Sequence, residues 1–239
     1  MRRRRVGIGS ILAFSVAALA VLAILGAAFL QQRSLRSDAA AMPVPSPTVS
    51  SRPTAVFIGD SYSAGVGATS EQKRWVNRVA YAEGWTLVNL AAGGTGYAIS
   101  AGQAGCGEDY CPPYRGVLDR VRALDPAIVV VSGGRNDLGV SDAKAVAAIQ
   151  AFYPALRQAA PKATIYATSP IWDDSPAPVR LTALGPVVQR AAEGVGGVYL
   201  DIGQPLRGSS ANVIGDSVHP SDIGHGLIAD AVLGTLKRR

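Results

Sequence analysis

One serine of this chain stands in a setting typical of an enzymatic nucleophile. Ser61 follows the apolar run of residues 55–58 and has the small residues Gly59, Ala64 and Gly65 around it. A strand-to-helix turn that is tight enough to present a hydroxyl group cannot carry bulky neighbours. We therefore interpret Ser61 as a nucleophile, although the same residue types also favour an ordinary turn.

A candidate base lies near the other end of the chain, in residues 216–220. A serine hydroxyl is a poor nucleophile until a base removes its proton, and neutral imidazole is the usual base. Asp216, three residues before His219, can reach the other ring nitrogen and stabilise the imidazolium. The second of the two histidines, His225, also has an acid three residues earlier, at Asp222. Position favours His219, which precedes a predicted helix, and we interpret His225 as structural.

Two loops carry candidate donors for a developing negative charge, at residues 89–96 and 132–137. Acyl transfer from an ester needs hydrogen-bond donors aimed at the oxygen that becomes negative. A glycine N–H of the first loop and the amide of Asn136 in the second can serve. Each loop is also consistent with a simple turn, and the first has Ile99 where a dinucleotide-binding fingerprint needs glycine.

The elements that must position these residues alternate along the chain. Apolar runs predict strands at residues 55–58, 86–90, 128–132, 164–168 and 198–201. Helices are expected near residues 72–83, 114–124, 141–159, 179–193 and 221–236, the last with Ser221 as its N-cap. Such alternation predicts an α/β fold with a parallel sheet covered by helices on both sides. Ligands bind at the carboxyl ends of such strands, which is where Ser61 falls.

The N-terminal part predicts export with a membrane anchor. Four arginines in the basic segment 1–5 precede residues 6–30, which carry no charge and are long enough for one transmembrane helix. The arginines predict a cytoplasmic N-terminus and an extracytoplasmic remainder. A cleaved signal peptide is the alternative, in which case the protein is secreted. Residues 31–53 are rich in Pro, Ser and Ala and predict a linker.

The charge is distributed unevenly. Residues 1–53 carry seven basic side chains and one acidic, which accounts for the net charge of +6, whereas residues 54–239 are balanced. The basic character therefore reports membrane topology, and the sequence gives no reason to expect nucleic-acid binding.

Two cysteines lie in one glycine-containing loop. Cys106 and Cys111, with four residues between them in an exported domain, predict a small-loop disulfide beside the substrate cleft. This loop offers too few ligands for a metal, and no cofactor is expected.

Taken together, four blocks resemble the SGNH hydrolases, also called GDSL esterases and lipases. The blocks are residues 59–61, the glycine loop ending at Gly94, residues 134–137 and residues 216–220, and their order and spacing cover essentially all of residues 54–239. The resemblance implies a flavodoxin-like three-layer α/β/α sandwich with a parallel sheet of about five strands. It also implies hydrolysis of an ester or thioester through an acyl-enzyme.

The resemblance assigns roles by motif position. Ser61 would be the nucleophile, His219 the base and then the acid, and Asp216 its orienting partner. The oxyanion hole would consist of the backbone of Ser61 and Gly94 and the side chain of Asn136. The chain has Ala91 where many members have glycine, so Gly93 is an alternative donor, but alignment from Asn89 favours Gly94.

Two further residues are candidates for the substrate cleft. Arg135 either contacts an acidic substrate or, as we expect, pairs with Asp137 on the rim. Trp172 follows the fourth predicted strand and either lines the acyl or alcohol pocket or caps a loop.

The sequence thus predicts a membrane-tethered extracytoplasmic serine esterase. Its expected substrates are O-acyl esters, with short acyl chains, of small molecules, glycans or lipids of the cell envelope. An O-acyltransferase with the same nucleophile is a second hypothesis. A noncatalytic module that binds acylated glycan is a third, although binding alone does not need an activated serine.

Overall fold

The structure, a computed structural model, describes residues 52–238. The predicted basic segment 1–5 and membrane span 6–30 lie outside these residues, as does the predicted linker except for its last two residues. Within the part that is described, no helix has the length and apolar character needed to cross a membrane.

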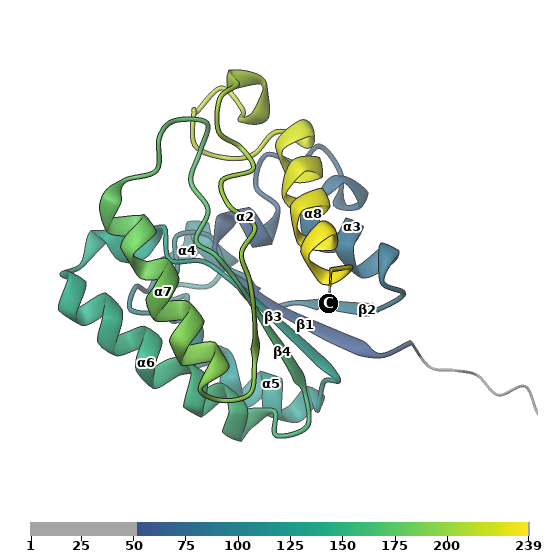
Figure 1. Cartoon of the computed structure of the whole chain (residues 1–239), viewed down its shortest axis with the longest axis vertical. Coiled ribbons are helices and arrows are strands. Elements are labelled where there is room, and N and C mark those ends of the chain that lie inside the picture. The colour runs from purple at the N-terminus through teal and green to yellow at the C-terminus, as the bar shows by residue number, and fades with distance from the viewer. Residues whose placement is uncertain (1–51, 239) are drawn as a thin grey trace, which may run out of the picture. The chain divides into compact units, whose positions relative to one another are not determined.

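Five parallel strands form one sheet in the order β2-β1-β3-β4-β5 (Figure 1). Their bounds are β1 Thr54–Gly59, β2 Thr86–Asn89, β3 Ile128–Ser132, β4 Thr164–Thr168 and β5 Val198–Leu200. This is the strand order of the flavodoxin-like doubly wound folds. The predicted α/β class with five parallel strands is confirmed, and β3 and β4 have the predicted bounds.

Helices cover both faces of the sheet (Figure 1). α3 (Trp75–Ala82) and α8 (Asp222–Leu236) pack against one face, and α5 (Leu118–Leu124), α6 (Asp142–Ala159) and α7 (Val179–Glu193) pack against the other. Because side chains alternate along a strand, β1 contributes to two hydrophobic clusters. Ala55 and Phe57 belong to the cluster beneath α3 and α8, while Val56 and Ile58 belong to the other.

Two predicted helices differ from the observed ones at their starts. Residues 72–83 are interrupted at Arg74, whose extended backbone (φ −62°, ψ 138°) separates a 3-10 turn at Glu71–Lys73 from α3. The segment that begins at residue 114 is a 3-10 helix, Tyr114–Val117, before α5 starts. α8 begins as predicted, since Ser221 Oγ accepts the N–H of Gly224 at 3.2 Å.

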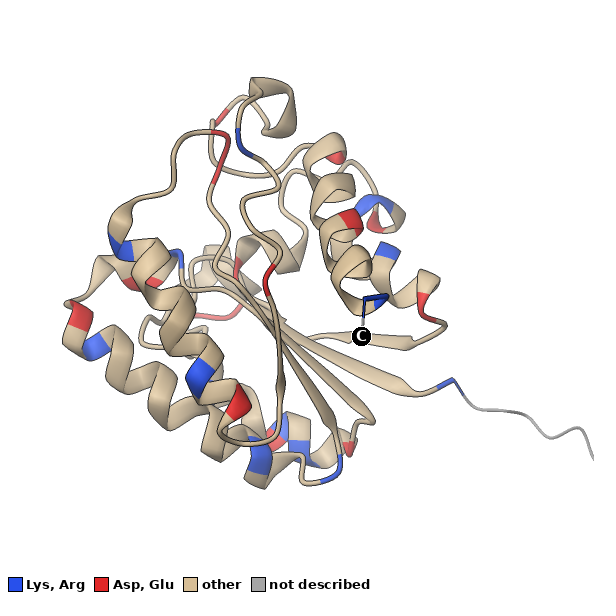
Figure 2. Ribbon diagram, in the orientation of Figure 1, with Lys and Arg blue, Asp and Glu red and all other residues tan. Residues whose placement is uncertain are grey.

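Several short elements lie in the loops that follow the strands. They are α2 (Ser61–Ala64), α4 (Gln103–Cys106) and the 3-10 helices Asn136–Gly139 and Ser210–Asn212. Basic and acidic residues are interspersed along the covering helices, in keeping with the balanced charge of residues 54–239 (Figure 2).

Candidate active site

Ser61 begins α2 directly beyond the end of β1 and is 9% exposed. The preceding Asp60 caps the helix, because its carboxylate accepts the N–H of Tyr62 at 3.0 Å. Gly59 leaves no space for a side chain, since a Cβ there would lie 2.6 Å from the carbonyl oxygen of Ser132. The turn therefore needs glycine before the cap and places the Ser61 hydroxyl at the carboxyl edge of the sheet.

Asp60 is buried beside the serine and is 4% exposed. Burial raises the pKa of its carboxyl group to about 6, while the hydrogen bond from the N–H of Tyr62 acts in the opposite direction. This carboxyl group therefore titrates close to neutral pH.

Asp216 and His219 form a closed turn before α8. The Asp216 carboxylate contacts His219 Nδ1 at 2.6 Å through Oδ2 and accepts the N–H groups of Val218 and His219, both at 2.9 Å, through Oδ1. Ser217 takes the left-handed conformation that the tight turn requires, with φ 57°. Hydrogen bonds, above all the one from the imidazole, lower the pKa of Asp216 to about 2. The arrangement fixes Nδ1 against the carboxylate and leaves Nε2 as the ring nitrogen for proton transfer.

The two glycines after β2 differ in their hydrogen bonds. The N–H of Gly93 is donated to the carbonyl oxygen of Gly105 at 2.8 Å, whereas the N–H of Gly94 has no hydrogen-bond partner within residues 52–238. Gly94 has a positive φ of 73°. Of the two alternatives, Gly94 is thus the one whose N–H is available for a ligand. Asn136 donates from Nδ2 to the carbonyl oxygen of Thr95 at 2.8 Å, and the second proton of that amide group remains for a ligand.

One cavity of about 590 Å³ brings the candidate residues together. Ser61, Gly94, Arg135, Asn136 and His219 line it, and the chain from Ala101 to Gly105 contributes further lining. Asp216 is not part of the lining, because it contacts the Nδ1 side of His219. Within residues 52–238, no group of three or more histidine, cysteine or carboxylate side chains is placed to hold a metal ion.

Arg135 does not pair with Asp137, so this prediction is wrong. Its guanidinium lies 2.9 Å from Asp173 and donates to Tyr62 Oη at 3.2 Å. Asp137 is fully buried and accepts the N–H groups of Tyr97 and Ala98, at 3.0 and 2.7 Å. The two neighbouring side chains thus point to different parts of the protein, and the charge of Arg135 is neutralised within the protein.

Trp172 contacts Arg135, which lines the cavity. Its ring lies over the guanidinium at 3.7 Å, and its Nε1 donates to Ser175 Oγ at 3.0 Å. It is absent from the residues that line the cavity. Trp172 therefore covers the arginine and also holds its own loop through Ser175, which is consistent with the predicted alternative that it caps a loop.

The predicted disulfide joins Cys106 and Cys111, with an S–S distance of 2.05 Å. The bridge closes the end of α4, and the preceding Gly105 is the residue that accepts the N–H of Gly93. A Cβ on Gly105 would lie 2.3 Å from the Gly93 carbonyl oxygen. The disulfide loop is therefore in direct backbone contact with the loop that carries Gly94.

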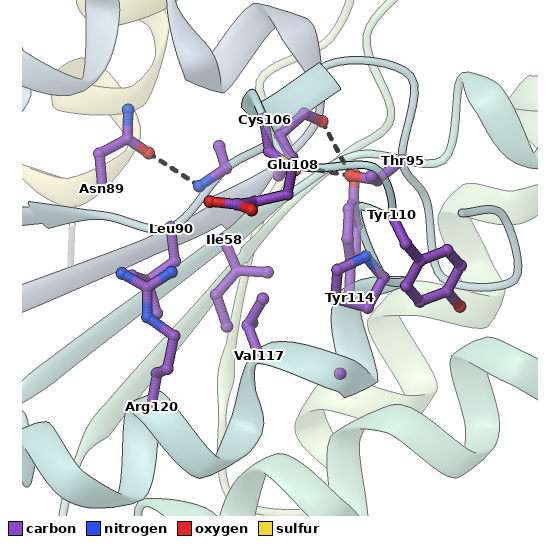
Figure 3. Close-up of a pocket in the computed structure, with 15 residues that line it drawn as sticks. Ile58, Asn89, Leu90, Thr95, Cys106, Glu108, Tyr110, Tyr114, Val117 and Arg120 are labelled. Carbon is purple, nitrogen blue, oxygen red and sulfur yellow. Dashed lines mark hydrogen bonds between the residues drawn. The ribbon is translucent and has the colours of Figure 1, made fainter. Parts of the chain in front are cut away.

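A second cavity, of about 410 Å³, is also lined in part by the disulfide loop (Figure 3). Thr95, Cys106, Glu108 and Tyr114 are among the residues that line it, and Ser61 is not. Of these two cavities, Ser61 therefore lines the first and not the second.

His225 is buried inside α8, as the sequence predicts for a structural histidine. It is 0% exposed, its Nδ1 accepts the N–H of Trp75 at 3.4 Å, and its Nε2 lies 3.2 Å from the carbonyl oxygen of Val66. Burial lowers the pKa of this imidazole to about 4.

Sequence reasoning missed Tyr62 and Asp173 as parts of the site. Tyr62 is 2% exposed and contacts both Arg135 and the loop that holds His219. The signal that could have drawn attention to it is its place directly after Ser61.

Comparison with known proteins gives matches over most of the chain. A model of the GDSL-like lipase/acylhydrolase family matches residues 57–227. A GDSL lipase from Mycobacterium tuberculosis is 31% identical over 191 residues, which cover 75% of this chain and 79% of that protein.

Solved structures share the fold at lower identity. A salicylyl-acyltransferase from a tetracycline biosynthetic pathway has a TM-score of 0.61 and 22% identity, covering 80% of this chain and 55% of its own. The esterase EstA from Pseudoalteromonas sp., inhibited by monoethylphosphonate, has a TM-score of 0.58 and 20% identity, covering 78% of this chain and 97% of its own. This chain spans about half the length of that acyltransferase.

Proposed function

Because the chain belongs to the GDSL-like lipase/acylhydrolase family, and is therefore a GDSL-type ester hydrolase, we propose that Ser61, His219 and Asp216 carry out its reaction. The observation that supports this proposal most directly is the single cavity that Ser61, Gly94, Asn136 and His219 line, with Asp216 2.6 Å from the far side of the imidazole.

In the acylation half, Ser61 Oγ attacks the ester carbonyl carbon while Nε2 of His219 takes the hydroxyl proton. The Asp216 carboxylate holds Nδ1 and stabilises the imidazolium that forms. The tetrahedral intermediate then collapses, the bond to the alcohol oxygen breaks, and His219 returns the proton to that oxygen. The products of this half are the free alcohol and an acylated Ser61.

In the deacylation half, a water molecule attacks the acyl carbon while His219 again takes a proton. Collapse of the second tetrahedral intermediate breaks the bond to Ser61 Oγ, and His219 gives the proton back to the serine. The net reaction consumes one water and releases one carboxylic acid, without a cofactor.

The negative charge of both intermediates falls on the former carbonyl oxygen. The N–H groups of Ser61 and Gly94 and the amide of Asn136 are the proposed donors to this oxygen. Such donors act mainly in the transition state, so losing one of them typically costs a factor of about 10²–10³ in kcat.

The lining of the cavity favours esters of short acyl chains. Most of the residues that line it are small, or polar with short side chains, and none is a large apolar residue; Gly93, Gly94 and Ala101 are examples. The one cation that lines the cavity, Arg135, is paired with Asp173 and does not require an acidic substrate. We propose short-chain O-acyl esters of envelope glycans or lipids as substrates.

The location belongs to the same proposal. Residues 6–30 would anchor the protein in the membrane with residues 1–5 in the cytoplasm, and residues 31–53 would link the anchor to an extracytoplasmic domain, 54–239. The four arginines before an uncharged stretch support this topology. If the N-terminal segment is cleaved, the domain is released instead.

The test uses the full chain in a non-ionic detergent, with a fluorescent alkylphosphonate and p-nitrophenyl esters of increasing chain length. We expect the probe to label Ser61 and the shortest esters to be hydrolysed fastest. Ser61→Ala and His219→Ala should each reduce turnover to about a thousandth or less. Ser63→Ala is the matched control, because Ser63 is also buried in α2 and its Oγ has no hydrogen-bond partner within residues 52–238.

Undiminished turnover in Ser61→Ala would refute the assignment. Labelling of Ser61 with little hydrolysis until an alcohol acceptor is added would instead identify an acyltransferase, a reaction that the similar fold of the salicylyl-acyltransferase supports as the second candidate. A folded protein with neither labelling nor turnover would favour the binding module.

A further inference from the structure

Three side chains, of Asp173, Arg135 and Tyr62, form a continuous series of hydrogen bonds beside the proposed catalytic residues. Asp173 accepts from Arg135 at 2.9 Å, Arg135 donates to Tyr62 Oη at 3.2 Å, and Tyr62 donates to the carbonyl oxygen of Val218 at 2.5 Å. These hydrogen bonds involve direct sequence neighbours of three residues that have a proposed role at the reacting centre, Ser61, Asn136 and His219. The neighbouring pairs are Ser61–Tyr62, Arg135–Asn136 and Val218–His219.

The chemistry of the groups fixes the direction of these hydrogen bonds. A guanidinium has no acceptor, so the Tyr62 oxygen must accept from Arg135. The single hydroxyl proton is then free for the Val218 carbonyl oxygen, which can only accept. Tyr62 therefore uses its donor and acceptor functions together. A side chain at this position that could not both donate and accept would leave Arg135 or the Val218 carbonyl group without this hydrogen bond.

Burial makes these contacts strong. Tyr62 is 2% exposed, and the side chains of Arg135 and Asp173 are 13% and 8% exposed. Hydrogen bonds to charged groups gain strength when water is excluded. The ring of Trp172 covers the guanidinium at 3.7 Å, which holds the arginine in one position.

Tyr62 connects two segments that the sheet does not hold together. The loop of His219 is closed at its base by the backbone hydrogen bond from Ile214 N–H to the His219 carbonyl oxygen at 2.8 Å, and the N–H of Ser221 joins it to the 3-10 helix through the carbonyl oxygen of Asn212 at 3.0 Å. These bonds set the shape of the loop. Hydrogen bonds from Thr69 to Asp222 join the segment after Ser61 to the start of α8, and the Tyr62 hydroxyl adds a direct connection to the His219 loop itself, at Val218, 156 residues away in sequence.

We propose that Tyr62 is a positioning residue, which holds the His219 loop over Ser61 through the carbonyl group of Val218, and that Arg135, fixed by Asp173, orients the Tyr62 hydroxyl. This inference rests on the proposed roles of Ser61 and His219. The Tyr62 ring also contacts the His219 ring edge to face, with centroids 6.2 Å apart. A phenylalanine at this position keeps that contact and loses only the hydroxyl.

The test compares the full-length Tyr62→Phe variant with the wild type in detergent. We expect kcat for a short p-nitrophenyl ester to fall by about 10- to 100-fold, the cost typical of a misplaced catalytic group, with KM within about twofold. The rate of phosphonate labelling should fall by the same factor, while the final fraction of labelled protein stays complete.

Tyr153→Phe is the matched control. Tyr153 is fully buried and its hydroxyl contacts that of Tyr97 at 2.8 Å, so the variant also loses one buried hydroxyl group. It should keep the wild-type kcat. In a second comparison, Arg135→Lys keeps a cation beside Asp173 but cannot also reach Tyr62, and its effect on kcat should be less than additive with that of Tyr62→Phe.

Three results would overturn the inference. They are a wild-type kcat in Tyr62→Phe, an equal loss in Tyr153→Phe, and a loss of kcat that matches a loss of the labelled fraction, which would mean that Tyr62 only maintains the fold. If the wild type itself is not labelled at Ser61, the proposed function fails first, so the two failures are distinguishable.

Discussion

Protonation of His225 should destabilise the protein at mildly acidic pH. In the native state Nδ1 accepts the N–H of Trp75, and Nε2–H donates to the carbonyl oxygen of Val66. This pattern needs a neutral ring, because a proton on Nδ1 would face the Trp75 N–H and place a charge in a fully buried site. Burial accordingly lowers the pKa of His225 to about 4, from the 6.5 of an unperturbed histidine.

The pKa difference fixes the sign and size of the effect. A group with a lowered native pKa contributes stability that is present above the unfolded-state pKa, near 6.5, and is lost as the pH falls toward about 4. Over the 1.5 units between pH 6.5 and pH 5, the unfolded state binds one more proton than the native state. At about 1.4 kcal/mol per unit, His225 therefore removes about 2 kcal/mol of unfolding free energy in this range.

The measurement is urea unfolding at pH 7 and pH 5, followed by tryptophan fluorescence, for the wild type and His225→Gln. Glutamine keeps an amide donor for Val66 but does not titrate. The variant should lose about 2 kcal/mol less than the wild type between the two pH values, whatever its stability at pH 7. The comparison between the two proteins is needed because Asp60 titrates in the same range with the opposite sign. Identical losses in both proteins would refute a neutral, buried His225.

Two further predictions concern groups next to the cavity. The native pKa of Asp60 is raised to about 6, so its contribution to stability is present below pH 4 and is lost as the pH rises through 6. Asp60→Asn keeps the cap acceptor but does not titrate. Between pH 4 and pH 8, the unfolding free energy of this variant in urea should therefore rise by up to about 3 kcal/mol relative to that of the wild type. An equal pH dependence in both proteins would contradict this. The double substitution Cys106→Ser and Cys111→Ser should lower the unfolding free energy by about 2 kcal/mol. It should also reduce kcat, because Gly105, next to the disulfide, positions the Gly93 loop through a backbone hydrogen bond. Unchanged kcat in the folded variant would show that the disulfide does not influence the site.

Two strands could be predicted with their bounds from residue type. The run 128–132 is apolar up to its last residue and buried throughout, which in a parallel sheet identifies a strand without any alternation. The run 164–168 consists of β-branched, aromatic and small residues, which favour strands although Thr164 is exposed. The long α7 also has the predicted bounds, because its apolar positions recur with helical spacing. The short α2 and α4 could not be predicted, because a single helical turn carries no periodicity and depends on the loops that hold it.

The partner of Arg135 shows why local spacing fails inside a site. Asp137 is only two residues away, but a turn of 3-10 helix begins at Asn136 and directs Asp137 inward, where two backbone N–H groups satisfy it. Arg135 pairs instead with an acid of another loop, Asp173, which is 38 residues away in the sequence. Nothing in the sequence alone favours Asp173 over Asp137 as the partner of Arg135.

The same contrast separates catalytic side chains from positioning ones. Chemistry restricts a nucleophile, its base and the oxyanion donors to a few residue types, and a parallel sheet gathers them at one edge, so Ser61, Asn136 and His219 could be proposed for these roles from type and order alone. The requirement on Tyr62 is geometric instead, since its hydroxyl group has to reach both Arg135 and the Val218 carbonyl group, to accept from one and donate to the other. Its partners lie 73 and 156 residues away and become visible only when the loops are folded. Tyr62→Phe therefore tests whether the hydroxyl group of Tyr62 positions the His219 loop, a role that the folded structure suggests and the sequence motifs do not.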